Sequence, residues 1–338
     1  MVLSPKDEYV DRVRALGARH IHLELDNGGV NPFKDIRALT RLTLLFRKEK
    51  PDVVLTFTPK VNIYGSLAGR ITRVPVIANI SGLGTGFIRG GWLTVVVKCL
   101  YRLALRHPVT VFFENEDDLS LFVKAGLVRE SVVRCLPGSG VDVDGFSPVT
   151  LTPIDDKVVF LVVARLLWDK GIGEYVEAAR LLKRDFPFAE FRVLGFFYTK
   201  NPTAISREQM AAWESEGVIR YLGATDDVAP HYASADCVVL ASYREGTPRS
   251  LLEAASMGKP IIATDAPGCR NVLEDGVTGF LVGLRDSTDL AEKMKKMLLL
   301  PPQQRRLMGE RGREKMIREF DERIVIERYL TAIAEVFR

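Results

Sequence analysis

The chain has 338 residues, of which 47% are hydrophobic and 27% are charged. This is the balance of a folded protein long enough for two domains, and it excludes an intrinsically disordered chain. No apolar run reaches the ~20 residues that a membrane-spanning helix needs, and the first residues are too polar for a secretory signal. The four cysteines and four histidines are scattered. Their spacing indicates neither a disulfide framework nor a zinc site, and it favours a reducing, cytoplasmic setting.

Charge is distributed unevenly along the chain. Residues 1–113 carry 17 Lys and Arg against 8 Asp and Glu, a net charge of +9, whereas the remainder carries 30 against 35, a net charge of −5. A basic first part suits an anionic partner, for which phosphates, a membrane surface and nucleic acid are all candidates. The alternative is that solvated basic side chains cluster there by chance.

Short apolar runs alternate with amphipathic segments from one end of the chain to the other. In the first part, buried strands are predicted at Val53–Phe57, Val74–Ile80 and Val109–Phe113, with helices at Asp35–Lys50 and Trp92–Arg106. The alternation lapses at residues 138–156, which are rich in Gly, Pro, Asp and Thr and are interpreted as a linker. It then resumes with strands predicted at Val158–Val163, Phe191–Leu194, Ile219–Leu222, Cys237–Ala241 and Pro260–Thr264. The connecting helices are predicted at Gly173–Arg184, Arg207–Glu216 and Pro248–Met257, and the chain from Thr288 onward is predicted to be almost entirely helical.

This alternation predicts right-handed βαβ units, and therefore an α/β protein with two doubly wound, parallel-sheet domains that face across a cleft. In such sheets ligands bind beyond the carboxyl ends of the strands, so the residues just after each strand are the candidates for function.

The first candidate follows the strand at Val158–Val163 and reads Ala164-Arg165-Leu166-Leu167-Trp168-Asp169-Lys170-Gly171. The guanidinium of Arg165 and the ammonium of Lys170 suit a diphosphate leaving group, whose charge grows as a glycosidic bond breaks. The alternative is that both side chains are simply solvated in a loop.

The second candidate follows the strand at Cys237–Ala241 and reads Arg244-Glu245-Gly246-Thr247-Pro248-Arg249-Ser250-Leu251-Leu252-Glu253. Pro248 suits the first turn of a helix, so the amides from Gly246 to Ser250 form a positive helix terminus that can seat a phosphate. Glu245 is placed to hold sugar hydroxyls and Glu253 to hold a ribose. Their alternatives are a favourable charge near a helix start and a surface helix residue.

The third candidate is Asp265-Ala266-Pro267-Gly268-Cys269-Arg270, followed by Glu274-Asp275-Gly276-Val277-Thr278-Gly279-Phe280. Its glycines indicate tight turns near the same end of the sheet, and ordinary loop punctuation is the alternative.

Together these motifs resemble the retaining GT-B glycosyltransferases of family 4. The resemblance rests on the order Arg-x4-Lys-Gly, Glu-Gly-x-Pro-x-Ser-x-x-Glu-Ala, Gly-Lys-Pro-Ile-Ile-Ala-Thr-Asp and Asp-Gly-x-x-Gly-Phe-Leu-Val within residues 157–338. It implies that Arg165 and Lys170 bind the donor diphosphate, that Glu245 contacts the transferred sugar and that Glu253 contacts the ribose. The backbone at Gly223 and Ala224 would read the base, commonly uracil.

The resemblance also implies a domain division. Residues 1–145 would form the acceptor-binding domain, residues 146–156 the linker and residues 157–318 the nucleotide-sugar-binding domain. A last helix at residues 319–338 would cross back to the first domain.

The first part of the chain narrows the resemblance to a bacterial subgroup that builds O-antigen, capsule and N-glycan precursors and includes undecaprenyl-diphosphate-linked N-acetylgalactosaminyltransferases. The segments that carry it are Thr58–Gly65, Ile80–Phe87 and Asn201–Ser206. Relatives often carry a histidine near the transferred sugar, but here Lys60 stands in that region, so the histidine's role does not transfer. Lys60, Asn62, Gly82 and Gly84 are the expected acceptor-binding residues, with Lys60 meeting the acceptor's diphosphate.

Basic residues recur on the helix predicted at Trp92–Arg106. Lys98, Arg102 and Arg106 are four residues apart and share one face. Trp92, Val95, Val96, Cys99 and Leu103 flank that face. Such a helix can lie on an anionic membrane, where each basic side chain adds ~1 kcal/mol. The alternative is an ordinary surface helix whose apolar side packs in the core.

The resemblance therefore implies a metal-independent, retaining hexosyltransferase without a cofactor. It would move a hexose or N-acetylhexosamine from a UDP-sugar to a polyprenyl-diphosphate-linked glycan. The enzyme would be peripheral on the cytoplasmic face of the inner membrane and would not bind nucleic acid. One alternative is an inactive GT-B relative that serves as a binding subunit. The other is a nicotinamide-dependent Rossmann oxidoreductase, although the glycines of residues 82–86 stand at alternate positions and the third is not at the spacing that its turn needs.

The start of the sequence carries one further expectation. Met1–Pro5 and the helix-like Asp7–Leu16 resemble the second βα unit of the family's first domain. The family's opening strand, glycine-rich turn and first helix have no counterpart, so we expect a start upstream of Met1 or an impaired product.

Overall fold

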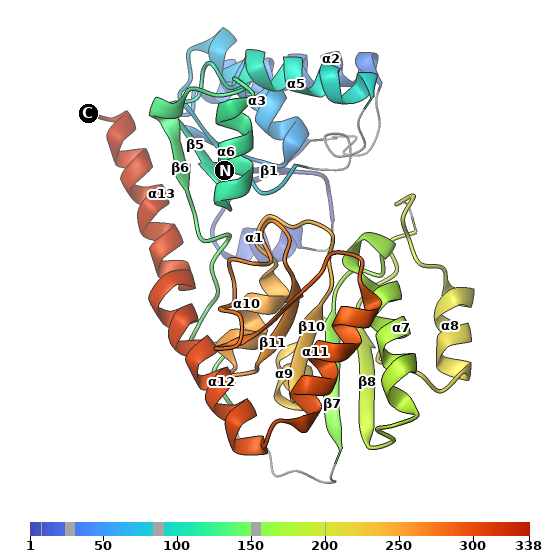
Figure 1. The fold of residues 1–338 in the computed structure, drawn as a ribbon. Helices are drawn as coiled ribbons and strands as arrows, with labels where there is room; N and C mark the ends of the chain where they lie inside the picture. Colours follow the sequence, from blue (N-terminus) through green and yellow to red (C-terminus); the bar gives the residue numbers. More distant parts are fainter. Residues whose placement is uncertain (8, 24–30, 84–90, 150–156, 200) are drawn as a thin grey trace. The chain divides into compact units, whose positions relative to one another are not determined.

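The computed structural model describes residues 1–7, 9–23, 31–83, 91–149, 157–199 and 201–338. They form two compact units (Figure 1). Unit 1 comprises Met1–Phe112, Ser120–Arg134 and Ala332–Arg338, and unit 2 comprises Phe113–Leu119 and Cys135–Thr331. A short segment from the first part of the chain thus belongs to unit 2.

The first part of the chain contains six described strands in two sheets. The parallel pair β1 (Val2–Ser4) and β2 (His20–His22) forms one sheet, and the other has the order β3-β4-β5-β6. Its strands are β3 (Val54–Phe57), β4 (Val76–Ile80), β5 (Thr110–Phe113) and β6 (Val133–Cys135). The strands predicted at Val53, Val74 and Val109 are confirmed with bounds shifted by one or two residues, whereas β2 and β6 are too short to have been predicted.

Helices pack against these strands. They are α1 (Val10–Ala15), α2 (Pro32–Glu49), α3 (Pro59–Thr72), α5 (Trp92–Ala104), α6 (Glu116–Lys124) and the 3-10 turn η1 (Glu130–Val132). The predicted helices α2 and α5 are confirmed, but α3 was not predicted because glycines interrupt its pattern. A Cβ at Gly65 would lie 2.7 Å from Thr56 Cγ2, and one at Gly69 would lie 2.4 Å from Val76 Cγ2. The glycines therefore let α3 lie directly on β3 and β4.

Unit 2 is built on one six-stranded sheet with the order β12-β11-β10-β7-β8-β9, in which every pair is parallel. The strands are β7 (Val158–Val163), β8 (Ala189–Leu194), β9 (Arg220–Tyr221), β10 (Cys237–Leu240), β11 (Ile261–Thr264) and β12 (Gly279–Val282). Five of the six are the predicted strands. The sixth, β12, was interpreted as part of a glycine-containing loop.

Helices cover both faces of this sheet (Figure 1). Val158, Phe160 and Val162 of β7 point into one core with α7 (Ile172–Lys183), α8 (Arg207–Ser215) and α11 (Ser287–Leu299). Val159 and Leu161 point into the opposite core with α9 (Ala229–Ala233) and α10 (Arg249–Ser256). Because β7 is buried on both faces, its sequence is an unbroken apolar run, as expected for a central parallel strand.

The last part of the chain is helical, as predicted. It contains α12 (Pro302–Lys315), a π-helical turn η3 (Met316–Phe320) and α13 (Glu322–Val336). The guanidinium of Arg313 donates to the carbonyls of Val143, at 3.0 Å, and of Phe146, at 3.1 Å. Both carbonyls lie within residues 138–156, so these bonds tie the first part of the segment interpreted as a linker to α12 of unit 2.

Candidate functional site

The loops with the strongest sequence signals lie at the point where the strand order of unit 2 reverses. The chain runs from β7 outward to β8 and β9, and then from β10 outward in the other direction to β11 and β12. The loop after β7 contains Arg165 and Lys170, and the loop after β10 contains Glu245. Such a switch point in an open parallel sheet is where ligands bind, so the topology of unit 2 places both motifs at one site.

Lys170 and Glu245 form an ion pair across this switch point. Their side chains are 15% and 14% exposed, so the pair is largely shielded from solvent. Lys170 lies in the 3-10 turn η2 (Trp168–Lys170), and Gly171 after it adopts a φ of +69°. A Cβ at Gly171 would lie 2.1 Å from the carbonyl oxygen of Ala241, so only glycine allows η2 to approach the end of β10 this closely.

The backbone from Gly246 to Ser250 leads into α10. The helix begins at Arg249 with Pro248 as its N-cap, one residue later than predicted, so Pro248 is not in the first turn. Leu251 N, in the first turn of α10, donates to the carbonyl of Pro248 at 3.0 Å. The amides of Gly246 and Thr247, which precede the helix, donate to no residue in the described part of the chain. These amides are available to an anion.

Close backbone packing holds this loop in place. Glu245 N donates to the carbonyl of Pro267 at 3.1 Å. Gly268 has a φ of +81°, and a Cβ there would lie 2.2 Å from the carbonyl oxygen of Gly246. The third sequence motif therefore supports the second. The alternative that its glycines are ordinary loop residues does not account for Gly268, because a side chain there would collide with the Gly246 carbonyl.

Glu253 is buried inside α10, with 8% of its surface exposed. Its carboxylate accepts hydrogen bonds from the Tyr232 hydroxyl at 3.1 Å and from Arg249 Nε at 2.8 Å. Burial raises the pKa of Glu253, against the lowering effects of Arg249 and Tyr232. The alternative that Glu253 is a surface helix residue is therefore wrong.

The remaining predicted donor residues lie at the ends of neighbouring strands. The guanidinium of exposed Arg165 lies over the Tyr198 ring, 5.5 Å from its centroid, and no contact joins it to Lys170 within the described residues. Gly223 follows β9 with a φ of +80°, and its carbonyl accepts from Gly195 N at 2.9 Å. Ala224 next to it is exposed. The loops after β7, β8 and β9 are thus adjacent, which is the arrangement expected of a nucleotide site.

The sequence analysis missed two buried polar residues at this site. Asn115 and Asp118 precede and begin α6, belong to unit 2, and are 1% and 0% exposed. Asn115 contacts the carbonyl of Gly246, and Asp118 pairs with Arg244. Burial raises the pKa of Asp118, opposed by the guanidinium of Arg244. The helix-capping pattern of Asn115 followed by three acidic residues was the one available signal, and it gave no hint of a contact so distant in sequence.

Two of the predicted acceptor residues lie on α3 of unit 1. Lys60 is in the first turn of α3, and its ammonium lies 2.7 Å from the Asp35 carboxylate. Thr58 before it has a φ of +73°, an unusual conformation for a residue other than glycine. Asn62, by contrast, is 1% exposed and donates to the carbonyl of Asn79 at 2.7 Å. This bond ties α3 to β4, so Asn62 has a structural contact through Nδ2 that the sequence analysis did not expect.

Gly82 follows β4 with a φ of +133°. Gly84 lies outside the described residues.

The helix α5 exposes a row of apolar side chains. We call Trp92, Val95, Val96, Cys99 and Leu103 the apolar face of α5. Trp92 is 73% exposed and Val95 61%, whereas Tyr101 on the other side of the helix is fully buried. The interpretation in which these residues pack in the core is therefore wrong.

The basic residues of α5 differ from one another. Arg102 donates to the carbonyls of Ala125, at 2.8 Å, and Gly126, at 3.1 Å, at the end of α6. Arg106 is exposed and Lys98 is half-buried. Arg102 thus has a structural role that its spacing alone did not indicate.

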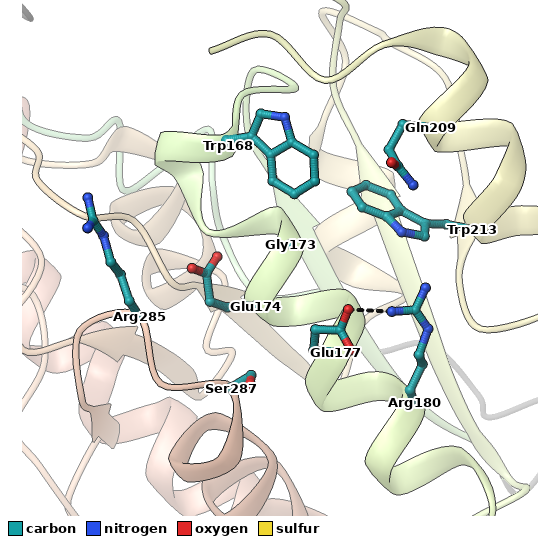
Figure 2. A pocket seen from close by; sticks show the side chains of 9 residues that line it. All are labelled: Trp168, Gly173, Glu174, Glu177, Arg180, Gln209, Trp213, Arg285 and Ser287. Atoms are coloured by element: carbon teal, nitrogen blue, oxygen red, sulfur yellow. Dashed lines mark hydrogen bonds and ion pairs between the residues drawn. The ribbon is translucent and has the colours of Figure 1, made fainter.

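A separate pocket of about 470 Å³ opens between η2, α7, α8 and the residues before α11 (Figure 2). Trp168 and Trp213 meet edge to face at its wall, with ring centroids 5.6 Å apart. Arg180 is paired with Glu177, also in the wall. The pocket is lined by Trp168, Gly173, Glu174, Glu177, Arg180, Gln209, Trp213, Arg285 and Ser287. None of the predicted donor-binding residues lines it, so this pocket is distinct from the switch-point site.

Two searches cover the described part of the chain only. There, no three His, Cys, Asp or Glu side chains gather as a metal site would require. No helix among those residues has the length and apolar character to span a bilayer.

Family models match both parts of the chain. Residues 1–138 match the model described as "Glycosyl transferase 4-like domain", and residues 148–315 match "Glycosyl transferases group 1".

Curated relatives match over most of their length. The N,N'-diacetylbacillosaminyl-diphospho-undecaprenol alpha-1,3-N-acetylgalactosaminyltransferase of Campylobacter jejuni subsp. jejuni serotype O:2 is 29% identical over 353 residues, which covers 100% of this chain and 91% of that protein. The UDP-Gal:alpha-D-GlcNAc-diphosphoundecaprenol alpha-1,3-galactosyltransferase of Escherichia coli is 26% identical over 269 residues, covering 76% of this chain and 69% of that protein.

Solved structures share the fold. A glycosyltransferase from Rickettsia africae ESF-5 superposes with a TM-score of 0.77 at 20% identity, covering 99% of this chain and 89% of that one. Anabaena Alr3699/HepE, in complex with UDP and glucose, gives a TM-score of 0.78 at 18% identity, with coverage of 98% and 91%. Both likenesses concern the fold alone.

Proposed function

Because the chain belongs to the group 1 glycosyltransferases and has the GT-B fold, we propose that it transfers a hexose or N-acetylhexosamine from a UDP-sugar to a polyprenyl-diphosphate-linked glycan. The product would be a precursor of a surface polysaccharide, such as O-antigen or capsule, or of a glycoprotein. The names of the Campylobacter and Escherichia relatives, which act on undecaprenyl-diphosphate sugars, support this acceptor class.

One observation carries the donor proposal. The Lys170–Glu245 pair lies at the switch point of unit 2, and Glu245 is in the same loop as the amides that lead into α10. An ammonium and a helix terminus bind a diphosphate, while the adjacent carboxylate accepts from sugar hydroxyls. Glu253, buried below on α10, would hold the ribose, and Gly223 and Ala224 the uracil.

We propose a front-face reaction that retains configuration. The bond between the sugar's anomeric carbon and the β-phosphate oxygen breaks, and the acceptor hydroxyl oxygen bonds to the same face of that carbon. The hydroxyl proton passes to the departing β-phosphate oxygen, so UDP leaves protonated. Lys170, Arg165 and the amides of Gly246–Ser250 would stabilise the negative charge that grows on this oxygen.

The same residues support a proposal of metal independence. The positive charge that a divalent cation supplies in other transferases would come here from Lys170, Arg165 and the α10 terminus. We therefore propose that transfer persists in excess EDTA and that the enzyme needs no cofactor.

The acceptor would bind to unit 1. Lys60 lies at the start of the fourteen-residue helix α3, where the helix dipole also favours an anion. The apolar face of α5, together with exposed Arg106, would rest on the anionic cytoplasmic face of the inner membrane, where a lipid-linked acceptor is found. This would make the enzyme peripheral and cytoplasmic, with no role for nucleic acid.

A donor screen with a polyprenyl-diphosphate-linked acceptor tests the proposal. We expect one UDP-sugar to give a product one sugar heavier by mass spectrometry, in EDTA, with the anomeric configuration of the donor by proton NMR. Configuration opposite to that of the donor would reject the front-face reaction, and EDTA sensitivity would reject metal independence. If UDP binds but no donor is used with any acceptor, the inactive-relative alternative holds. The oxidoreductase alternative is not favoured, because both family models describe glycosyltransferases.

A further inference from the structure

The loop after β10 is bonded to a segment that lies far earlier in the chain. Asn115 Nδ2 donates to the carbonyl oxygen of Gly246, 131 residues later, at 2.9 Å. The Thr247 hydroxyl donates to the carbonyl of Glu114 at 2.8 Å. Arg244 at the start of the loop pairs with Asp118. All of these residues belong to unit 2, so the segment Phe113–Leu119 is a built-in support of the loop.

The amide of Asn115 can be oriented in only one way. Its Oδ1 accepts from Asp118 N at 2.8 Å, the bond of a helix N-cap at the start of α6. The Nδ2 is therefore the atom that faces Gly246, and it also donates to Asp118 Oδ2 at 3.2 Å. With Asn115 buried, every atom of this side-chain amide has a fixed partner.

The orientation of the Gly246 peptide follows from this bond. In a trans peptide the carbonyl of one residue and the N–H of the next point in opposite directions. Holding the Gly246 carbonyl against Asn115 therefore turns the N–H of Thr247 to the other side of the loop. Gly268 packs against the same carbonyl, so the peptide has no room to flip.

We propose that Asn115 and Asp118 are positioning residues for the donor's diphosphate. They fix the orientation of the peptide groups whose N–H groups donate to the phosphate oxygens. This rests on the proposed UDP-sugar donor. Asn115 sets the orientation of the Gly246–Thr247 peptide, and Asp118 bonds to both Asn115 and Arg244. Neither residue touches the substrate. Their effect is on the affinity for the β-phosphate and on the charge that develops there during transfer.

The variant Asn115→Asp separates this role from helix capping. Aspartate is as good an N-cap as asparagine, so α6 keeps its start. The oxygen that replaces Nδ2 faces both the Gly246 carbonyl and Asp118 Oδ2, and it repels these two acceptors. The matched control is Asn31→Asp, because Asn31 caps α2 through bonds to Phe33 N and Lys34 N and has no bond to this loop. The second variant, Asn115→Ser, keeps a capping oxygen. It removes the Nδ2 group that donates to the Gly246 carbonyl, without adding charge.

Calorimetric titration with UDP and with UMP tests the proposal, since only UDP carries the β-phosphate. We expect Asn115→Asp to weaken UDP about tenfold or more and UMP less than twofold, with kcat also reduced. Asn115→Ser should weaken UDP by a smaller factor, and Asn31→Asp should change neither nucleotide. Thermal unfolding of all variants reports folding.

Three results overturn the inference. Unchanged UDP affinity in both folded Asn115 variants rejects the positioning role alone. Equal losses of UDP and UMP show general damage to the site rather than peptide positioning. A wild-type protein that binds neither nucleotide overturns the proposed donor, and the inference with it.

Discussion

Around the loop after β10, charged side chains are buried against partners from the same unit, whereas on α5 of unit 1 apolar side chains are exposed to solvent. Lys170 and Glu245 are each about 15% exposed and paired, while Trp92 is 73% exposed. Buried charges need preorganised partners, and such sites favour an ionic ligand that replaces water. Exposed apolar residues in a row favour a surface that removes them from water. The two regions are thus suited to a nucleotide and to a lipid surface respectively.

We expect the largest effect from removing a charged side chain beside the loop after β10. Lys170→Ala should lower kcat/KM by about 10²–10³-fold, the usual loss when one electrostatic contact to a developing negative charge is removed. Arg165→Ala should have a similar or smaller effect, because Arg165 is exposed. Steady-state kinetics with the cognate donor provides the measurement. Lys157→Ala is the control, since that lysine is 51% exposed on an outer ion pair with Glu190. A loss in kcat/KM below about threefold for Lys170→Ala would show that Lys170 does not stabilise the transition state.

The next effect divides the two glutamates of this region. Glu253→Gln should weaken UDP about tenfold, because the ribose loses a charged acceptor. Glu245→Gln should leave UDP affinity within twofold of wild type and lower kcat, because Glu245 would contact the transferred sugar. Calorimetry with UDP and kinetics with the donor separate the two. Equal losses of UDP affinity would show that the roles are not divided.

The apolar region should respond to lipid and not to nucleotide. Replacing Trp92 and Val95 by Ser should lower partitioning onto anionic liposomes about tenfold or more, since a large apolar side chain contributes ~1.5–3 kcal/mol when it leaves water. Sedimentation with phosphatidylglycerol vesicles measures this, and added salt should weaken binding by screening the basic residues. Leu181→Ser, at a 55% exposed position on α7, is the control. Unchanged binding in the double variant would argue that the apolar face of α5 contacts a protein instead.

The smallest effect sharpens the comparison within α5 itself. Arg102→Ala should lower the free energy of unfolding by about 1 kcal/mol, because the carbonyls of Ala125 and Gly126 lose their donor. It should reduce liposome binding less than Arg106→Ala does. Chemical denaturation and sedimentation give the two numbers. If Arg102→Ala and Arg106→Ala reduce liposome binding equally and stability is unchanged, Arg102 acts in membrane binding rather than in holding the end of α6.

The sequence predicted the central strands of unit 2 well. The apolar run of β7 is buried on both faces and needs no further information. The short edge strand β12 was missed because it begins at Gly279. A Cβ at Gly279 would lie 1.9 Å from the carbonyl oxygen of Ile261, so this glycine allows a close strand contact rather than a turn. The helix α3 was missed for the same reason at Gly65 and Gly69.

The candidate site was predictable where a residue stands in a local motif after a strand, and not where a residue reaches the site only through the fold. Lys170 and Glu245 stand in local motifs that follow strands, and the structure brings them together. Asn115 and Asp118 reach the same loop only through the fold. Conversely, Asn62 stands in a local segment that was assigned to acceptor binding, but helix packing buries it and turns it toward β4. Local pattern cannot determine which side of an unpredicted helix faces the sheet.

The pairing of Lys170 with Glu245 has a consequence for what the enzyme can accept. In the structure the Lys170 ammonium is paired with the Glu245 carboxylate, which the sugar hydroxyls would need as their hydrogen-bond acceptor. Under the proposed function, a diphosphate would compete for the same ammonium, so its arrival would exchange one anionic partner for another and release Glu245 toward the sugar. A free hexose brings no such competitor and meets a carboxylate that is already occupied. Donor recognition would then be gated by the leaving group, and unactivated sugars in the cell would be poor inhibitors.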